Sequence, residues 1–143
     1  MNSIIYDKEI FIIPEEGKTE ISYSEGSDML ILCRKEDSDA NADLLGNILK
    51  AIGKEESNNV DVFRMEQEED LHLAKSLEKQ IKYVICFGLK PKNICMNAGF
   101  MANKLYKTED FSIMLTHSLS QLQADIKYKK ALWGALQQNF VKA

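Results

Sequence analysis

Four short apolar runs, each about the length of a β-strand, recur along this chain and constrain its fold more than any other feature. They span residues 29–33, 60–65, 83–87 and 111–115. The first and third runs are apolar throughout, which is typical of parallel strands that are covered on both faces. Between the first two lies a segment in which Leu44, Leu45 and Ile48 recur at helical spacing. Strands that alternate with helices predict a parallel, doubly wound sheet with right-handed crossovers.

We therefore expect a three-layer α/β sandwich around a four-stranded, mainly parallel sheet, with the strand at 29–33 in its centre. Helices are predicted near residues 44–52, 71–81, 118–123 and 127–140. Residues 90–107 have no assignable pattern. The single α/β domain would comprise residues 29–143, which is a length that one core can fill.

Residues 1–28 are predicted to form an N-terminal arm or β-hairpin. Two short runs, 9–14 and 19–24, flank a polar turn that contains Gly17, and residues 24–28 have the composition of a flexible joint.

Composition excludes several classes of protein. The 143 residues are 45% hydrophobic and 28% charged, close to the globular average, and the net charge of −4 argues against whole-molecule attraction to nucleic acid. The three cysteines lack zinc-site spacing, so we expect no metal and no cofactor. Neither a leader peptide nor a run of about 18 apolar residues is present, which predicts a cytoplasmic protein without membrane contact.

Candidate catalytic groups come from the loops that follow the strands, because open α/β sheets bind ligands at the carboxyl ends of their strands. Glu36 and Asp37 follow the first strand and could orient a water molecule, and His117 follows the last. No glycine lies between Gly26 and Gly46, so a phosphate cradle is not expected. His117 fits either a functional contact or a capping and packing role.

A second set of residues could bind a partner. The three lysines near the start of the last helix could contact phosphates or an acidic partner, or simply form a solvated face. Trp133 fits the core better than a base-stacking platform, although partner-binding hot spots are enriched in tryptophan. The binding candidates are Arg34, Lys35, His117, Ser118, Lys127, Lys129, Lys130 and Trp133.

Several strings resemble the uracil-DNA glycosylase superfamily, and within it the psi subunits of bacterial DNA polymerase III. The most specific is the tail, where His117-Ser118-Leu119 is followed by Leu122-Gln123-Ala124-Asp125 and then Lys129-Lys130-Ala131-Leu132-Trp133. Further similarity lies in residues 9–14, 29–33, 43–53 and 86–88.

The resemblance implies a glycosylase-like fold with the two sequence motifs of that superfamily. This chain departs from both motifs. Residues 34–38 occupy the place of the water-positioning motif but lack its glycines and proline, so only Glu36 or Asp37 could supply the acid. In the second motif His117 matches, whereas Ser118 replaces proline. Psi subunits are non-catalytic connectors, and the likeness implies that residues 1–28 dock on a clamp loader while the body binds another polymerase accessory subunit.

Our leading hypothesis is thus a non-enzymatic protein-interaction subunit of DNA replication or repair. The alternative is a divergent uracil-DNA glycosylase, or another DNA-binding enzyme, that uses Glu36 or Asp37 together with His117. A third possibility is a module that binds a small ligand in the same crevice.

Overall fold

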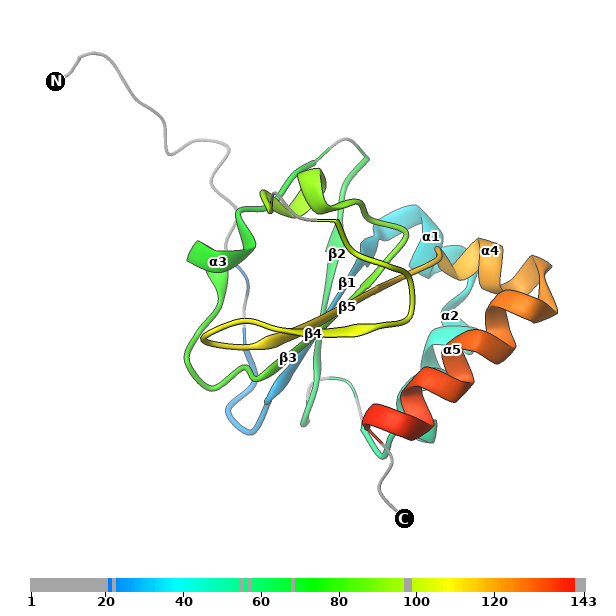
Figure 1. Ribbon diagram of the computed structural model, residues 1–143, viewed down its shortest axis with the longest axis horizontal. Helices are drawn as coiled ribbons and strands as arrows, with labels where there is room; N and C mark the ends of the chain where they lie inside the picture. Colours follow the sequence, from blue (N-terminus) through cyan, green and yellow to red (C-terminus); the bar gives the residue numbers. More distant parts are fainter. Residues whose placement is uncertain are drawn as a thin grey trace, which may run out of the picture.

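The computed structural model describes residues 21, 23–54, 56, 58–67, 69–96 and 99–140, and shows an α/β sandwich around one mixed sheet (Figure 1). Its elements are, in chain order, β1 (Met29–Arg34), α1 (Lys35–Ala40), α2 (Ala42–Ala51), β2 (Asp61–Met65), α3 (Leu73–Ser76), β3 (Tyr83–Phe87), the 3₁₀-helix η1 (Pro91–Ile94), β4 (Leu105–Lys107), β5 (Ser112–Thr116), α4 (Leu119–Ala124) and α5 (Ile126–Asn139).

The sheet has five strands in the order β2-β1-β3-β5-β4. The four strands that the apolar runs predict are all present and mutually parallel. The expectation that the strand at 29–33 is central is wrong, because β1 lies between β2 and β3 and it is β3 that occupies the centre. The predicted number of four strands is wrong, because β4 adds an antiparallel edge next to β5. This short strand lies in the segment to which the sequence assigned no structure, and none of its three residues is fully buried.

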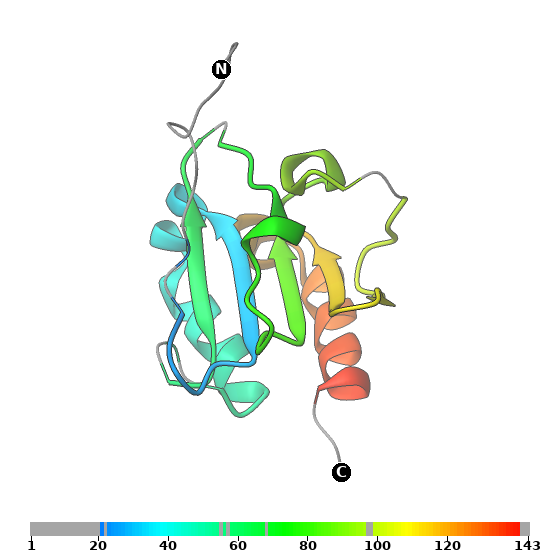
Figure 2. The same ribbon diagram turned by 90° about the vertical axis from the view of Figure 1, so that its left-hand side faces the viewer.

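Two apolar cores cover the two faces of the sheet, as the alternation of strand side chains requires. Met29, Ile31 and Cys33 of β1 face the core under α2, α4 and α5. Leu30 and Leu32 face the opposite core, which α3, η1 and the neighbouring loops cover. Figure 2 shows the same arrangement, with α2 and α5 behind the sheet and α3 in front of it.

The structure corrects two predictions about helices. The polar stretch after β1 was expected to be a loop but contains α1, in which only Ser38 is buried. The helix expected near 71–81 is only the single turn α3. Leu71 and Leu73 are both almost fully buried, at 1% and 0% exposure, although residues two apart lie on different sides of a helix.

The described part of the predicted N-terminal arm packs against the body. Ile21 and Tyr23 join the core under α3, and the Tyr23 hydroxyl donates a 2.7 Å hydrogen bond to the Ser76 carbonyl. Ser24 donates two 2.8 Å hydrogen bonds, from its amide and its hydroxyl, to the Asp61 carboxylate. Residues 24–28, the expected flexible joint, are therefore attached to β2, while the predicted hairpin falls on residues that are not described, apart from its last few.

Among the described residues, no helix combines the length and the apolar character that a membrane-spanning segment requires.

Candidate functional site

The strand order reverses between β1 and β3, and in doubly wound sheets the ligand crevice lies at the carboxyl ends of the strands beside such a reversal. A cleft of about 320 Å³ lies there. Its lining consists of Arg34, Glu36, Asp37, Gln67, Phe87, Gly88, Ser118 and Ser120. The cleft thus contains both carboxylates that the sequence singles out.

The Asp37 carboxylate is fully engaged in holding α4. One oxygen accepts a 2.7 Å hydrogen bond from the Leu119 amide, and the other accepts bonds of 2.9 and 2.7 Å from the Ser120 amide and hydroxyl. An anionic side chain at the first turn of a helix satisfies amides that have no partner within the helix. Asn41 adds a 3.0 Å bond from its Nδ2 to the Ser120 hydroxyl. Asp37 therefore joins α1 to α4.

Gly88 lets the end of β3 approach α4 closely. Its φ is +71°, and a Cβ at this position would lie 2.7 Å from the Ser118 Cβ and 3.0 Å from the Ser118 Cα. The first distance is shorter than the contacts that real Cβ atoms make, and the second is tighter than most of them. The positive φ also favours glycine at this position. Gly88 and Ser118 both line the cleft.

The Arg34 guanidinium is used within the protein. Its Nη1 donates hydrogen bonds of 2.7 and 2.6 Å to the carbonyl oxygens of Glu66 and Glu69. These bonds fix the loop that follows β2 across the mouth of the cleft. The neighbouring Lys35 forms an exposed 3.1 Å ion pair with Asp39 one turn further along α1, and this bond raises the pKa of Lys35. Glu36 remains exposed at the cleft.

His117 lies in a different hollow from the two carboxylates. Its ring stacks on Tyr128 of α5, with the centroids 3.8 Å apart and the planes 12° apart. Its Nδ1 is buried and has no hydrogen-bond partner among the described residues. The hollow beside it, of about 290 Å³, is lined by Gly88, Leu89, Lys90, Pro91, Phe100, Ala102, Leu115, Thr116, His117 and Gln121.

The residues that a glycosylase-like reaction would combine line two different hollows. Glu36 and Asp37 line the first hollow, His117 lines the second, and Gly88 contributes to both. Ser118 is the N-cap of α4, where its hydroxyl accepts a 3.1 Å bond from the Gln121 amide. A serine at this position satisfies an amide of the first turn that has no partner within the helix.

The remaining binding candidates lie on α5. Lys127 and Lys130 are exposed and Lys129 is half-buried, and no ion pair joins them to another described residue. Trp133 is half-buried and packs against the core under α5, as its helical position predicts. The lysines and Trp133 do not line either hollow at the carboxyl end of the sheet.

The thiols near the crevice are not activated. Burial raises the pKa of Cys33 to about 11, although a bond from Ser38 acts in the opposite direction, and burial also raises the pKa of Cys86. Cysteine reacts as the thiolate, so these two side chains behave as small apolar groups. Within the described residues, no three side chains of His, Cys, Asp or Glu are grouped to hold a metal ion.

Sequence reasoning missed the partners of these residues. Ser118 and Gln121 form a capping box, whose spacing is visible in the sequence. By contrast, no local pattern relates Asp37 to Ser120, or His117 to Tyr128, because each pair is joined only when the helices pack.

Fold and site together define a doubly wound α/β protein whose crevice is largely braced by its own polar groups. The sequence matches no model of a known protein family and no curated protein.

Proposed function

We propose that this protein is a non-catalytic interaction subunit of DNA replication or repair, with a glycosylase-like α/β body similar to that of polymerase psi subunits. The observation that carries the proposal is the use of Asp37. In the resemblance, Asp37 is one of two acids that could position water, yet its carboxylate accepts three hydrogen bonds from the first turn of α4. An acid that braces two helices is a structural group.

The separation of Glu36 from His117 further supports a non-catalytic role. Acid–base chemistry needs its groups within about 2.6–3.2 Å of the atoms between which protons move. Here Glu36 and His117 line two different hollows. This arrangement counts against the alternative of a divergent uracil-DNA glycosylase, and the proposal therefore assigns no catalytic residue.

The resemblance supplies the kind of partner. By likeness to psi subunits, residues 1–28 would dock on a clamp loader and the body would bind a second accessory subunit, in the cytoplasm. Contact with DNA would be made mainly by these partners. The lysines of α5 are the basic side chains of this chain that could contribute to it.

Affinity capture tests the proposal directly. The full chain, tagged at its C-terminus, is captured from its own cells with and without nuclease, and the bound proteins are identified by mass spectrometry. We expect clamp-loader or polymerase accessory subunits in both samples, because the contacts would be between proteins. Recovery of nucleic acid with no stable protein partner would overturn the proposal.

A uracil-release assay tests the enzymatic alternative. We expect no release from single-stranded or duplex DNA by the purified chain. Release at an enzyme-like rate that Glu36→Ala or His117→Ala abolishes would replace our proposal by the glycosylase. Lys50→Ala, on the exposed side of α2, provides a control for non-specific loss.

A further inference from the structure

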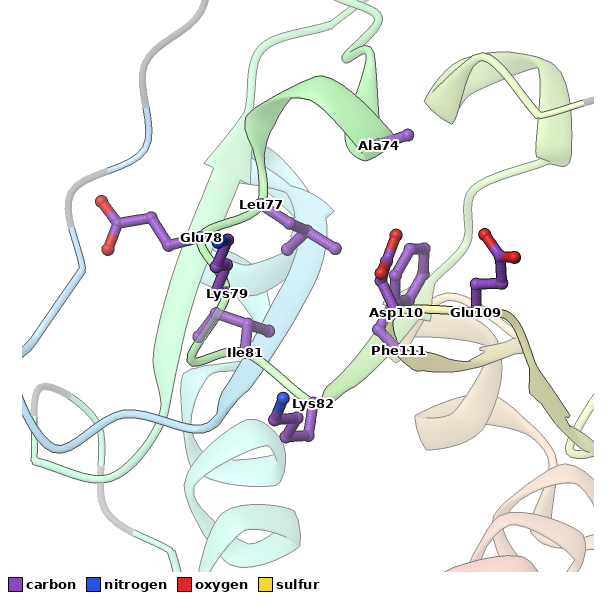
Figure 3. A pocket seen from close by; sticks show the side chains of 9 residues that line it. All are labelled: Ala74, Leu77, Glu78, Lys79, Ile81, Lys82, Glu109, Asp110 and Phe111. Carbon is purple, nitrogen blue, oxygen red and sulfur yellow. The ribbon is translucent and has the colours of Figure 1, made fainter.

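A third hollow lies at the opposite end of the sheet, near the amino ends of β3 and β5 (Figure 3). Its volume is about 380 Å³. One wall comes from α3 and the connection to β3, and the other comes from the turn between β4 and β5. No residue of this hollow belongs to the crevice described above.

The interior of the hollow is apolar. Ile81 is only 1% exposed at its floor, and Leu77 and Phe111 are half-buried and pack against the core under α3. Ala74 is exposed at the upper end of the wall. Figure 3 shows Leu77 and Ile81 on one side and Phe111 on the other, with space between them. An apolar hollow of this kind stabilises an apolar side chain that enters it.

The rim is charged. Lys79 and Lys82 stand on the α3 side together with Glu78, whose side chain points away from Phe111 in Figure 3, and Glu109 and Asp110 stand on the turn between β4 and β5. The two lysines and the two acids of the turn are exposed, and no hydrogen bond or ion pair joins their side chains to another described residue. No ion pair joins the lysines of one wall to the acids of the other, so these charges are available to a bound molecule.

We propose that this hollow is the docking site for an amphipathic helix of a partner protein. The helix would insert two apolar side chains, spaced by three or four residues, between Leu77 and Phe111. Acidic side chains at one flank would face Lys79 and Lys82, and basic side chains at the other flank would face Glu109 and Asp110. This inference rests on the proposed function, because it names the surface through which the body binds protein.

Volume and charge both favour this occupant. About 380 Å³ holds roughly two large apolar side chains, which is what one face of a helical turn presents. β3 and β5 are hydrogen-bonded to each other at this end, so the hollow offers no free strand edge to which an extended peptide could add. A rim that carries carboxylates as well as lysines repels a phosphate backbone at one wall, which disfavours nucleic acid.

A photo-crosslinking experiment in living cells tests the site. A benzophenone amino acid replaces Ala74, which is exposed at the hollow, and in a matched control replaces Asn47, which is exposed on α2 behind the sheet. After irradiation, the crosslinked peptides are sequenced by mass spectrometry. We expect position 74 to capture a segment of another protein with apolar residues at i and i+3 or i+4, an acidic flank and a basic flank.

The outcomes separate this inference from the proposed function. A replication protein that is captured at position 47 but not at 74 overturns the docking site and leaves the proposed function intact. Capture at 74 of a helix from a protein outside replication and repair supports the site and overturns that assignment. Capture of a second copy of this chain, of its own residues 1–20, or of nucleic acid overturns the site, and so does the absence of any crosslink at 74.

Charge reversal measures the contribution of the rim. With the captured partner purified, the affinity of the double variant Lys79→Glu/Lys82→Glu is compared with that of Lys50→Glu/Lys75→Glu, which changes the net charge equally at exposed positions outside the hollow. We expect the first to bind about tenfold more weakly and the second to bind within about twofold of the wild type. Equal affinities of the two variants would overturn the assigned role of Lys79 and Lys82.

Discussion

The two ends of the sheet use their polar residues in opposite ways. At the carboxyl end, the Asp37 carboxylate accepts hydrogen bonds from α4, and the Arg34 guanidinium donates hydrogen bonds to the loop after β2. At the amino end, Lys79, Lys82 and Asp110 surround an apolar hollow and bond to no other described side chain. At the crevice where such folds bind ligands, Asp37 and Arg34 thus hold the structure together, whereas the opposite end of the sheet presents unpaired charge among the described residues.

This difference shows that the position of a hollow in a fold does not by itself indicate its use. What matters is whether the polar groups around it are already satisfied, because a satisfied group gains little from a ligand and an exposed, unpaired group can still form new bonds. Five experiments can break or sharpen the comparison.

Thiol labelling should give the largest effect. Cys33 and Cys86 are buried in the sheet and their pKa values are raised, whereas Cys95 is exposed after η1. We expect alkylation of the two buried thiols to be on the order of a thousandfold slower than that of Cys95, because it requires an opening that costs several kcal/mol. Mass spectrometry of the native protein over time measures the rates. Rapid labelling of Cys33 would show that the carboxyl end opens easily.

The same thiols predict how stability depends on pH. A folded-state pKa of Cys33 near 11, above its ordinary value of about 9, means that the unfolded chain loses this proton first as the pH rises. The stability that the neutral thiol contributes is thus fully present below about pH 9 and is lost between about pH 9 and 11. Urea unfolding at several pH values measures this decline. A constant free energy of unfolding up to pH 11 would contradict it.

Gly88→Ala should strongly destabilise the carboxyl end. The new Cβ meets Ser118 and the residue must keep a positive φ, so we expect a loss of about 3 kcal/mol in urea unfolding. Gly53→Ala is the matched control, since Gly53 has a φ of +73° with no atom within 4 Å of the added Cβ. Its loss should be about 1 kcal/mol. If both variants lost the same free energy of unfolding, the close contact of the added Cβ with Ser118 would not destabilise the protein.

Asp37→Ala should cost about 2 kcal/mol, because it leaves two amides at the start of α4 without their acceptor. Glu36→Ala, at the exposed neighbouring position, should change the free energy of unfolding by less than about 0.5 kcal/mol. If instead Asp37→Ala were neutral in unfolding but abolished an activity, Asp37 would be a functional acid rather than a brace.

Reversal of the rim charges should have the smallest effect on stability. Lys79→Glu and Glu109→Lys remove no intramolecular bond among the described residues, so each should change the free energy of unfolding by less than about 0.5 kcal/mol. Thermal and urea unfolding of both variants measure this. A large loss would show that these charges stabilise the fold and are not reserved for a partner.

The central strands could be predicted from sequence because burial on both faces leaves a continuous apolar run, as in β1 and β3. The helix α1 could not be predicted, because its only buried residue is Ser38. It is held by hydrogen bonds that Asp37 accepts from α4 and that Asn41 donates to α4. The expected long helix around α3 is wrong because leucines at 71, 73 and 77 suit more than one period. Leu71 is buried but lies before α3, which begins only at Leu73.

For the site, the sequence singled out several residues that line the two hollows at the carboxyl end, but it did not indicate their partners. Asp37 was correctly placed at the carboxyl end of β1, where catalytic acids of such folds occur, and yet its partners lie on a helix that is far along the chain. The hollow at the amino end was not predicted at all. Its walls come from two connections, and the charges at 78–82 and 109–110 are indistinguishable in sequence from an ordinary solvated surface.

The antiparallel edge also bears on the order in which the chain folds. β4 pairs Lys107 with Ser112 across a short turn, whereas the parallel contacts of β1 join residues as distant as Met29 and Tyr83. Local pairs close within microseconds and distant ones wait for a larger loss of chain entropy. We therefore expect the β4–β5 hairpin to gain structure early, so that the acidic wall of the docking hollow would form before the lysine wall reaches its place opposite.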